Sequence, residues 1–222
     1  MALARLRSMI KTRLLPDLFE RAAVLFLFSY FLVRMTPRYY ALLSWGWANF
    51  GNFHIIFGAA FLIVSEALAV CIMTFRPLGQ PMSGRPLDWI LGFSGAAVPL
   101  LVHPAAAAGP FWITEPVMIT GLVLQIFAKI ALWTSFGVVP ARRRLRTDGP
   151  YSFVRHPIYL GYSLTHMGFL IGYPSTYNAA LYASVLLIDV SRLLREEQFF
   201  SSNPAYLAYS KRVRYRMIPG IF

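Results

Sequence analysis

The chain has 222 residues, of which 57% are hydrophobic and 14% charged, and its mean hydropathy is +0.55. Soluble domains are roughly 45–50% apolar and about 25% charged, so the composition excludes an ordinary soluble domain and predicts an integral membrane protein. The net charge of +12 would suggest nucleic acid in a soluble protein. In a membrane protein, basic residues instead gather near the cytosolic surface, so no nucleic-acid partner is expected.

Apolar stretches predict six membrane spans, since crossing the hydrocarbon core takes about 20 residues. The spans are expected, in chain order, at 22–33 (lengthened by 14–19 if the helix is long), 53–75, 87–102 with a kink at Pro99, 116–136, 158–173 and 176–194. Only Pro174 and Ser175 separate the last two, which predicts a tight helical hairpin. The expected fold is therefore an all-α, polytopic transmembrane helix bundle with a C-terminal interfacial helical segment.

The distribution of basic residues predicts the topology. Six spans with a cytosolic N-terminus place nearly all of the 21 Lys and Arg residues in cytosolic segments, with Arg34, Arg38 and Lys129 as the exceptions. Five spans would move the C-terminal basic cluster to the other side, so six are preferred. Both termini are expected in the cytosol. Residues 1–134 would form the N-terminal spans, and residues 135–222 a basic loop, the hairpin and a C-terminal cap, all in one membrane domain.

A few polar residues and one cysteine lie inside the apolar stretches. Polar groups there are costly unless they are paired or hydrated. Glu66 is expected to bond to a neighbouring helix, with a proton relay as the alternative, and Lys129 to extend its side chain to the cytosolic surface. His166 is expected to pack, with a cavity lining as the alternative. Cys71, the only cysteine, is expected to be a small buried residue, which leaves no disulfide framework and no metal cluster.

The segment that follows Ser135 combines basic residues with turn residues. A run of arginines at 142–146 precedes the turn residues Asp148, Gly149 and Pro150. Pro157 suits the first turn of a helix, where its missing N–H costs nothing. Arg155 and His156 would then lie at a helix N-terminus, where free N–H groups favour anionic ligands.

A second charged cluster lies where the last span ends. Arg192 and Glu196 are four residues apart and share a helix face, and Asp189 lies on the same side. Because the hairpin is tight, this cluster would return to the surface that holds Arg155 and His156. The two clusters together predict a site at the cytosolic surface, and the aromatic and basic tail at 206–216 would cover it.

These motifs resemble the isoprenylcysteine carboxyl methyltransferase family of integral membrane methyltransferases. The resemblance covers about 135–219, and related membrane phospholipid and thiol methyltransferases share parts of it. Its specific part is an Arg-His-Pro-x-Tyr-x-Gly element followed by Arg-x-x-x-Glu-Glu. The matching residues are Gly149, Pro150, Tyr151, Arg155, His156, Pro157, Ile158, Tyr159, Leu160, Gly161, Arg192, Glu196, Glu197, Tyr206, Tyr209 and Pro219.

The resemblance implies methyl transfer from S-adenosylmethionine to a lipophilic acceptor that enters from the bilayer. It implies catalytic roles for Arg155 and Arg192, with Arg192 facing the substrate. The residues implied to bind the cofactor are Arg143, Arg144, Leu145, Arg146, Tyr151, His156, Pro157, Ile158, Tyr159, Glu196 and Glu197. The chain departs from the family in a short segment between Glu197 and Tyr206, where Asn203-Pro204 replaces the usual Phe-Gly, so the cap and the acceptor are expected to differ.

Two other functions stay open at this point. Sterol reductases share a similar C-terminal hairpin and use NADPH, so a membrane reductase is one alternative. A non-enzymatic membrane subunit, whose charged clusters only bind a partner, is the other. For a methyltransferase, the acceptor is equally open: a prenylcysteine, a phospholipid amine, a small thiol or an isoprenoid acid.

Overall fold

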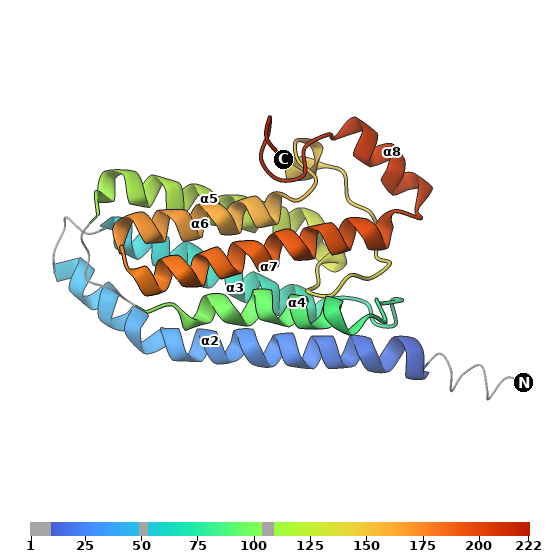
Figure 1. Ribbon diagram of the computed structural model, residues 1–222. Helices are drawn as coiled ribbons and strands as arrows, with labels where there is room; N and C mark the ends of the chain where they lie inside the picture. The colour runs from blue at the N-terminus through green and yellow to red at the C-terminus, as the bar shows by residue number, and fades with distance from the viewer. Residues whose placement is uncertain (1–9, 49–52, 104–108) are drawn as a thin grey trace, which may run out of the picture.

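The computed structural model describes residues 10–48, 53–103 and 109–222, and in these ranges the chain is helical, without strands. Six long helices run side by side, and a short seventh lies across one end (Figure 1). They are α2 (Leu15–Ala48), α3 (Phe53–Phe75), α4 (Pro86–Ala97), α5 (Phe111–Leu132), α6 (Pro157–Gly172), α7 (Thr176–Phe200) and α8 (Pro204–Arg212).

The helices follow the apolar stretches of the sequence, with differences at their ends. Helix α3 coincides with the predicted second span. Helix α4 ends at Ala97 and continues as the 3-10 turn Val98–Leu101, which contains Pro99, because a proline cannot donate to the preceding turn. Helix α2 continues through Pro37 well beyond the predicted first span. Helix α5 begins at Phe111, five residues earlier than predicted.

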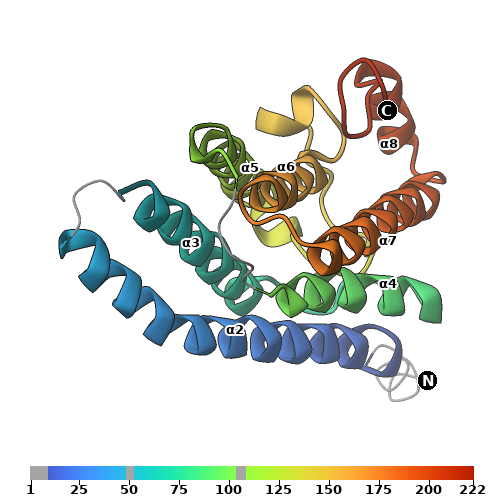
Figure 2. The ribbon, with the colours of Figure 1, turned by 60° about the vertical axis from the view of Figure 1, so that its left-hand side comes forward.

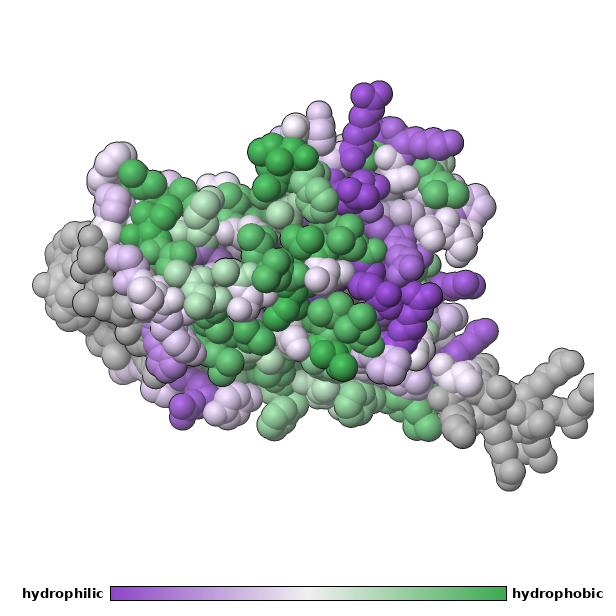
Figure 3. All heavy atoms as spheres, in the orientation of Figure 1, coloured by the Kyte–Doolittle hydropathy of each residue, from purple (hydrophilic) through white to green (hydrophobic). Residues whose placement is uncertain are grey.

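Two helical segments, Phe111–Ser135 and Thr176–Phe200, are long and apolar enough to cross a membrane. Apolar side chains cover the middle of the molecule in Figure 3, and hydrophilic ones gather near α8. Cys71 is exposed on α3, so its predicted burial is wrong. In a membrane, an apolar side chain on the protein surface can contact lipid tails, so burial inside the protein would add little stability.

Helix α6 packs closely on α5 through glycines. A Cβ atom at Gly168 would lie 2.7 Å from the backbone nitrogen of Met118, and one at Gly172 would lie 2.5 Å from the Thr114 side chain. The Gly-x-x-x-Gly pair of the sequence therefore lies in a helix contact. Tyr173–Ser175 separate α6 from α7, yet α7 packs more extensively on α4 than on α6 (Figure 2).

Buried ion pairs hold the loop after α5 against the start of α2. Glu20 accepts hydrogen bonds from the backbone nitrogens of Val138 and Val139 at 2.8 and 2.9 Å. It also pairs with Arg76 at 2.9 Å and with Arg143 at 2.8 Å. Asp17 is the second carboxylate on Arg76. Buried charges require such complete pairing, so this network fixes the path of residues 136–143.

Lys129 does not extend to the surface, and that prediction is wrong. Its side chain is buried, and its Nζ donates to the Ser65 carbonyl at 2.9 Å and to the Ser65 hydroxyl at 2.7 Å. Nζ also lies 3.3 Å from Oε1 of Glu66. Helix α3 packs on α5, which brings the Glu66 carboxylate close to the Lys129 ammonium group. Lys129 therefore pairs with Glu66 and does not need to reach the cytosolic surface. The predicted bond from Glu66 to a neighbouring helix is present.

Candidate active site

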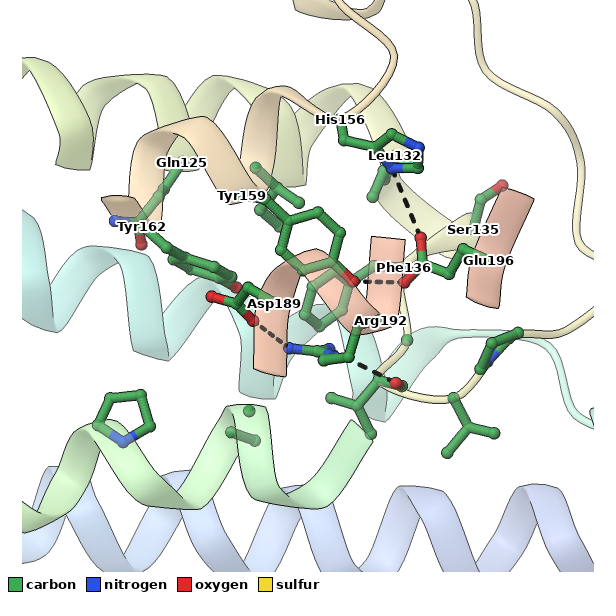
Figure 4. A pocket seen from close by; sticks show the side chains of 18 of the residues that line it. Gln125, Leu132, Ser135, Phe136, His156, Tyr159, Tyr162, Asp189, Arg192 and Glu196 are labelled. Carbon is green, nitrogen blue, oxygen red and sulfur yellow. Dashed lines mark hydrogen bonds and ion pairs between the residues drawn. The ribbon is translucent and has the colours of Figure 1, made fainter. Parts of the chain in front are cut away.

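A cavity of about 320 Å³ lies among α4, α5, α6 and α7. The loop that follows α5 lines it from one side, and Tyr206 and Tyr209 of α8 line the end nearest the polar surface. The cavity thus lies where the sequence brings its two charged clusters together (Figure 4).

Arg192 is buried on the cavity wall, with partners on most sides. Its Nη1 donates to Oδ1 of Asp189 at 3.1 Å, and Nη2 lies 3.5 Å from the Val138 carbonyl. Its guanidinium lies over the ring of Tyr159, 5.2 Å from the centroid. Figure 4 shows the side chains of Asp189, Arg192 and Tyr159 close together. Asp189 therefore already neutralises Arg192.

Glu196 lies beside Arg192, one helical turn further along α7. Its Oε1 accepts a hydrogen bond from the Tyr159 hydroxyl, and its Oε2 lies 3.7 Å from Nδ1 of His156. The Glu196 side chain is 23% exposed, whereas those of Asp189 and Arg192 on the same helix face are nearly buried. Glu196 is thus a carboxylate that lines the cavity and remains accessible to a ligand.

Glu197 shares His156 with Glu196, but its other partners differ and it does not line the cavity. It pairs with Nη1 of Arg155 at 3.2 Å, with Nε2 of His156 at 3.3 Å and with Nε of Arg216 at 2.8 Å. The backbone nitrogen of His156 also donates to the Arg216 carbonyl at 2.7 Å. Glu197 therefore joins the start of α6 to the C-terminal tail, and Arg155 is largely engaged by it.

Helix α8 covers one end of the cavity. Tyr206 and Tyr209 lie on its buried face and pack on Leu145 and Phe200. The Tyr209 hydroxyl donates to the Tyr151 carbonyl at 2.7 Å. Burial raises the pKa of Tyr209 to about 12, so this donor stays protonated at neutral pH.

The basic loop supplies polar groups without protein partners. Among the described residues, the buried Tyr151 hydroxyl and the Nε atoms of Arg146 and Arg192 have no hydrogen-bond partner. All three residues line the cavity. Buried polar atoms are nearly always hydrogen-bonded in a complete structure, so these atoms are expected to contact a ligand. Burial also raises the pKa of Tyr151 well above its usual range, which keeps its hydroxyl a donor.

Most residues that the sequence marked for a site do line this one cavity. They are Arg143, Arg144, Leu145, Arg146, Tyr151, Arg155, His156, Ile158, Tyr159, Arg192 and Glu196. Pro157 and Glu197 are not among the residues that line it. His166 lines the cavity and also stacks on Tyr182, with 4.5 Å between ring centroids.

The sequence interpretation missed several cavity residues that lie outside the motifs. Gly95 of α4, Gln125 of α5, and Tyr162 and Thr165 of α6 all line the cavity. Glu66 of α3 also lines it, although it was expected only to bond to a neighbouring helix or to relay protons. A polar residue inside an apolar stretch is costly, so its presence there can indicate a functional position. This signal singled out Glu66, and it applies equally to Gln125.

Comparison with known proteins bears on this part of the chain. Residues 114–206 match the phospholipid methyltransferase family. The matched segment runs from α5 to the start of α8 and includes the basic loop, Tyr159, Arg192 and Glu196. No curated protein and no solved structure matches the chain. The match supports a membrane methyltransferase that acts on lipid-type substrates with S-adenosylmethionine. The matched family is related to the isoprenylcysteine carboxyl methyltransferases that the motifs resemble. The match does not favour a reductase.

Proposed function

We propose that this chain transfers a methyl group from S-adenosylmethionine to a lipid that enters the cavity from the bilayer. The observation that carries the proposal is the arrangement of Glu196, Tyr159 and Arg192 around one cavity, inside the segment that matches the phospholipid methyltransferases. Arg146 and Tyr151 offer unpaired buried donors to the same space.

The residues present fit the cofactor's functional groups. S-adenosylmethionine supplies, when bound, an electrophilic methyl group on a positively charged sulfur. Arg144 and Arg146 would hold its carboxylate, and the Tyr151 hydroxyl would donate to one of its oxygen or nitrogen acceptors. Glu196 would favour its positive charges. Leu145 and Ile158 offer apolar surface beside these polar groups.

The chain's own contribution is then positioning and exclusion of water. Helix α8 covers the end of the cavity through Tyr206 and Tyr209, and Tyr209 also holds the Tyr151 backbone. Alignment of donor and acceptor supplies most of the rate in a displacement of this kind. Transfer to an amine releases a proton, and His156 and Glu196 are the cavity groups suited to accept it.

The charges around Arg192 favour a neutral amine over a carboxylate as the acceptor. Arg192 was expected to bind an anionic acceptor, but Asp189 already occupies Nη1. A substrate carboxylate would add negative charge beside both Asp189 and Glu196, which costs free energy in a partly dry cavity. The reacting amine of a lipid brings no such charge to this position. We therefore propose N-methylation of a lipid amine, and not O-methylation of a prenylcysteine carboxylate.

We also propose that six helices, α2 to α7, cross the membrane with both ends of the chain and the site on the cytosolic side. The basic segments at 142–146 and 211–216 lie at the hydrophilic end of the molecule near α8 (Figure 3). Basic residues concentrate on the cytosolic side of membrane proteins, which supports this orientation.

A calorimetric titration of the purified protein in detergent with S-adenosylmethionine measures the binding affinity and tests the proposal. Saturable binding is expected for the wild type, and Glu196→Gln and Tyr151→Phe should each weaken it about tenfold or more, which is about 1.4 kcal/mol. Labelled methyl transfer into a total membrane lipid extract should then yield a labelled lipid amine. Binding of NADPH in place of S-adenosylmethionine would contradict the proposal, as would a protein that binds the cofactor but labels no lipid.

A further inference from the structure

A second group of polar residues lines the inner part of the cavity, away from α8. Glu66 of α3, Gln125 of α5 and Thr165 of α6 belong to it, and the same cavity reaches Tyr159 and Arg192. Thr165 follows Tyr159 by six residues on α6, which separates the two groups by about 9 Å along the helix. Tyr162, halfway between Tyr159 and Thr165 on α6, also lines the cavity and lies between the two groups along this helix.

Close contact between α5 and α6 builds this inner group. The side-chain nitrogen of Gln125 donates to the Thr165 hydroxyl at 2.8 Å, and that hydroxyl donates to the Gly161 carbonyl at 2.9 Å. A Cβ atom at Gly161 would lie 2.7 Å from Cγ of Gln125, and one at Gly121 would lie 2.6 Å from the Thr165 hydroxyl. Both polar side chains are therefore held in place by glycines on the opposite helix.

Glu66 is supported from behind by Lys129. Lys129 is buried and bonds to Ser65 as well as to Oε1 of Glu66. The Glu66 side chain keeps 11% of its surface accessible and lines the cavity. Lys129 balances the charge of the carboxylate, and the remaining lone pairs of Glu66 are available to a ligand.

The donors and acceptors of the inner group define the ligand chemistry. The Glu66 carboxylate can only accept, and Gln125 has a second N–H besides the one given to Thr165. A hydroxyl is the group that both donates and accepts. We propose that Glu66 and Gln125 bind a hydroxyl in the body of the lipid acceptor, about 9 Å from the methylated nitrogen. This subsite rests on the proposed function, since it defines which lipid amine the cavity selects.

A single-chain glycerophospholipid with an ethanolamine headgroup has these features. Its free glycerol hydroxyl lies roughly eight bonds from the amine, a span of about 10 Å when extended. The amine would lie beside Glu196, at the end of the cavity nearest α8, and the hydroxyl would lie deeper, beside Glu66. Lysophosphatidylethanolamine and its analogue with hydrogen in place of that hydroxyl therefore form a matched pair of probes.

The experiment measures the affinity of both probes for full-length protein in detergent, loaded with S-adenosylhomocysteine so that no turnover occurs. Wild type should bind the hydroxyl probe about tenfold more tightly than the deoxy probe. Glu66→Gln and Gln125→Leu should each reduce this ratio to about one through weaker binding of the hydroxyl probe alone. Gln80→Leu, a change outside the cavity lining, should keep the wild-type ratio.

Equal affinities of the wild type for the two probes would overturn the subsite, and absence of binding by both counts as equal. An unchanged ratio in both cavity variants would also overturn it. Affinity for S-adenosylmethionine, measured on the same preparations, separates this result from failure of the proposed function. A wild type that binds the cofactor but ignores the hydroxyl contradicts the subsite alone, whereas a wild type that binds no cofactor contradicts the proposed function.

Discussion

Gly95 of α4 lies directly against the guanidinium of Arg192 on α7. A Cβ atom at Gly95 would be 2.4 Å from Nη1 of Arg192 and 2.9 Å from its Cδ. Arg192 has little room to retreat, because Asp189, the Val138 carbonyl and the Tyr159 ring enclose it. A helix outside the segment that matches the methyltransferase family therefore determines where an important side chain of the site lies.

Substitution Gly95→Ala should displace the Arg192 guanidinium and lower methyl transfer by about tenfold or more. Overpacking of this kind also costs about 1–3 kcal/mol of stability, so the apparent Tm should fall modestly. Activity per folded molecule, measured by labelled methyl transfer at a temperature well below both Tm values, separates the two effects.

Gly84→Ala is the matched control, since a Cβ atom at Gly84 meets no atom within 4 Å. Its activity and its Tm should equal those of the wild type. Full activity in Gly95→Ala would show that Arg192 tolerates displacement, and would contradict its role in the site.

We expect Asp189 to determine which charge the acceptor of the proposed reaction can carry. Asp189→Asn keeps a hydrogen-bond acceptor for Nη1 of Arg192 but removes the balancing charge. Methyl transfer to lipid amines should fall, and the affinity for an anionic competitor such as acetylated farnesylcysteine should rise at least about fivefold. Competition assays on wild type and variant measure this shift. Equal inhibition of both proteins by the competitor would count against the charge argument.

Glu20 holds the loop that carries Val138 and Arg143. Glu20→Gln removes a buried charge and leaves Arg76 and Arg143 short of a partner. Loss of one member of a buried ion pair costs about 3–5 kcal/mol, so the apparent Tm in detergent should fall by several degrees. Asp148→Asn, at an exposed carboxylate, is the control and should leave the Tm unchanged. A stable Glu20→Gln protein would mean that the loop is held by other contacts.

The sequence predicted the helices well, because each follows an apolar stretch bounded by charged or turn residues. It also predicted the meeting of the two charged clusters, because Arg155–His156 and Arg192–Glu196 lie near opposite ends of segments joined by a short turn. These inferences use contacts between residues that are near in sequence or related by helix geometry. Most of the cavity residues on α6, α7 and the basic loop belong to this class.

The pairing of distant charges could not be predicted. Glu20 and Arg143 are 123 positions apart, and Lys129 and Glu66 are 63 apart. Which of several buried charges meet depends on how α2, α3 and α5 are placed side by side, and one sequence does not determine that. The pairing of Arg192 with Asp189 is a different case, because the two residues are three positions apart on one helix face and this spacing could have predicted it.

The bond from Tyr209 to the Tyr151 carbonyl gives a pH prediction. Burial raises the pKa of Tyr209 from its ordinary value to about 12, because the folded state favours the neutral phenol. The stabilisation is therefore fully present below about pH 10 and is lost as the pH rises toward about 12. Tyr209→Phe keeps the ring packed on Leu145 but removes the donor, which should cost about 1 kcal/mol at neutral pH.

Unfolding of both proteins measured between pH 8 and about 12 checks this prediction. The wild type should lose stability more steeply above about pH 10 than Tyr209→Phe, since the variant lacks one of the titrating phenols. The variant should also bind S-adenosylmethionine more weakly at neutral pH, because the Tyr151 segment is no longer held by α8. Parallel stability curves for the two proteins would show that this hydrogen bond contributes nothing to the closed cavity, and α8 would then act through packing alone.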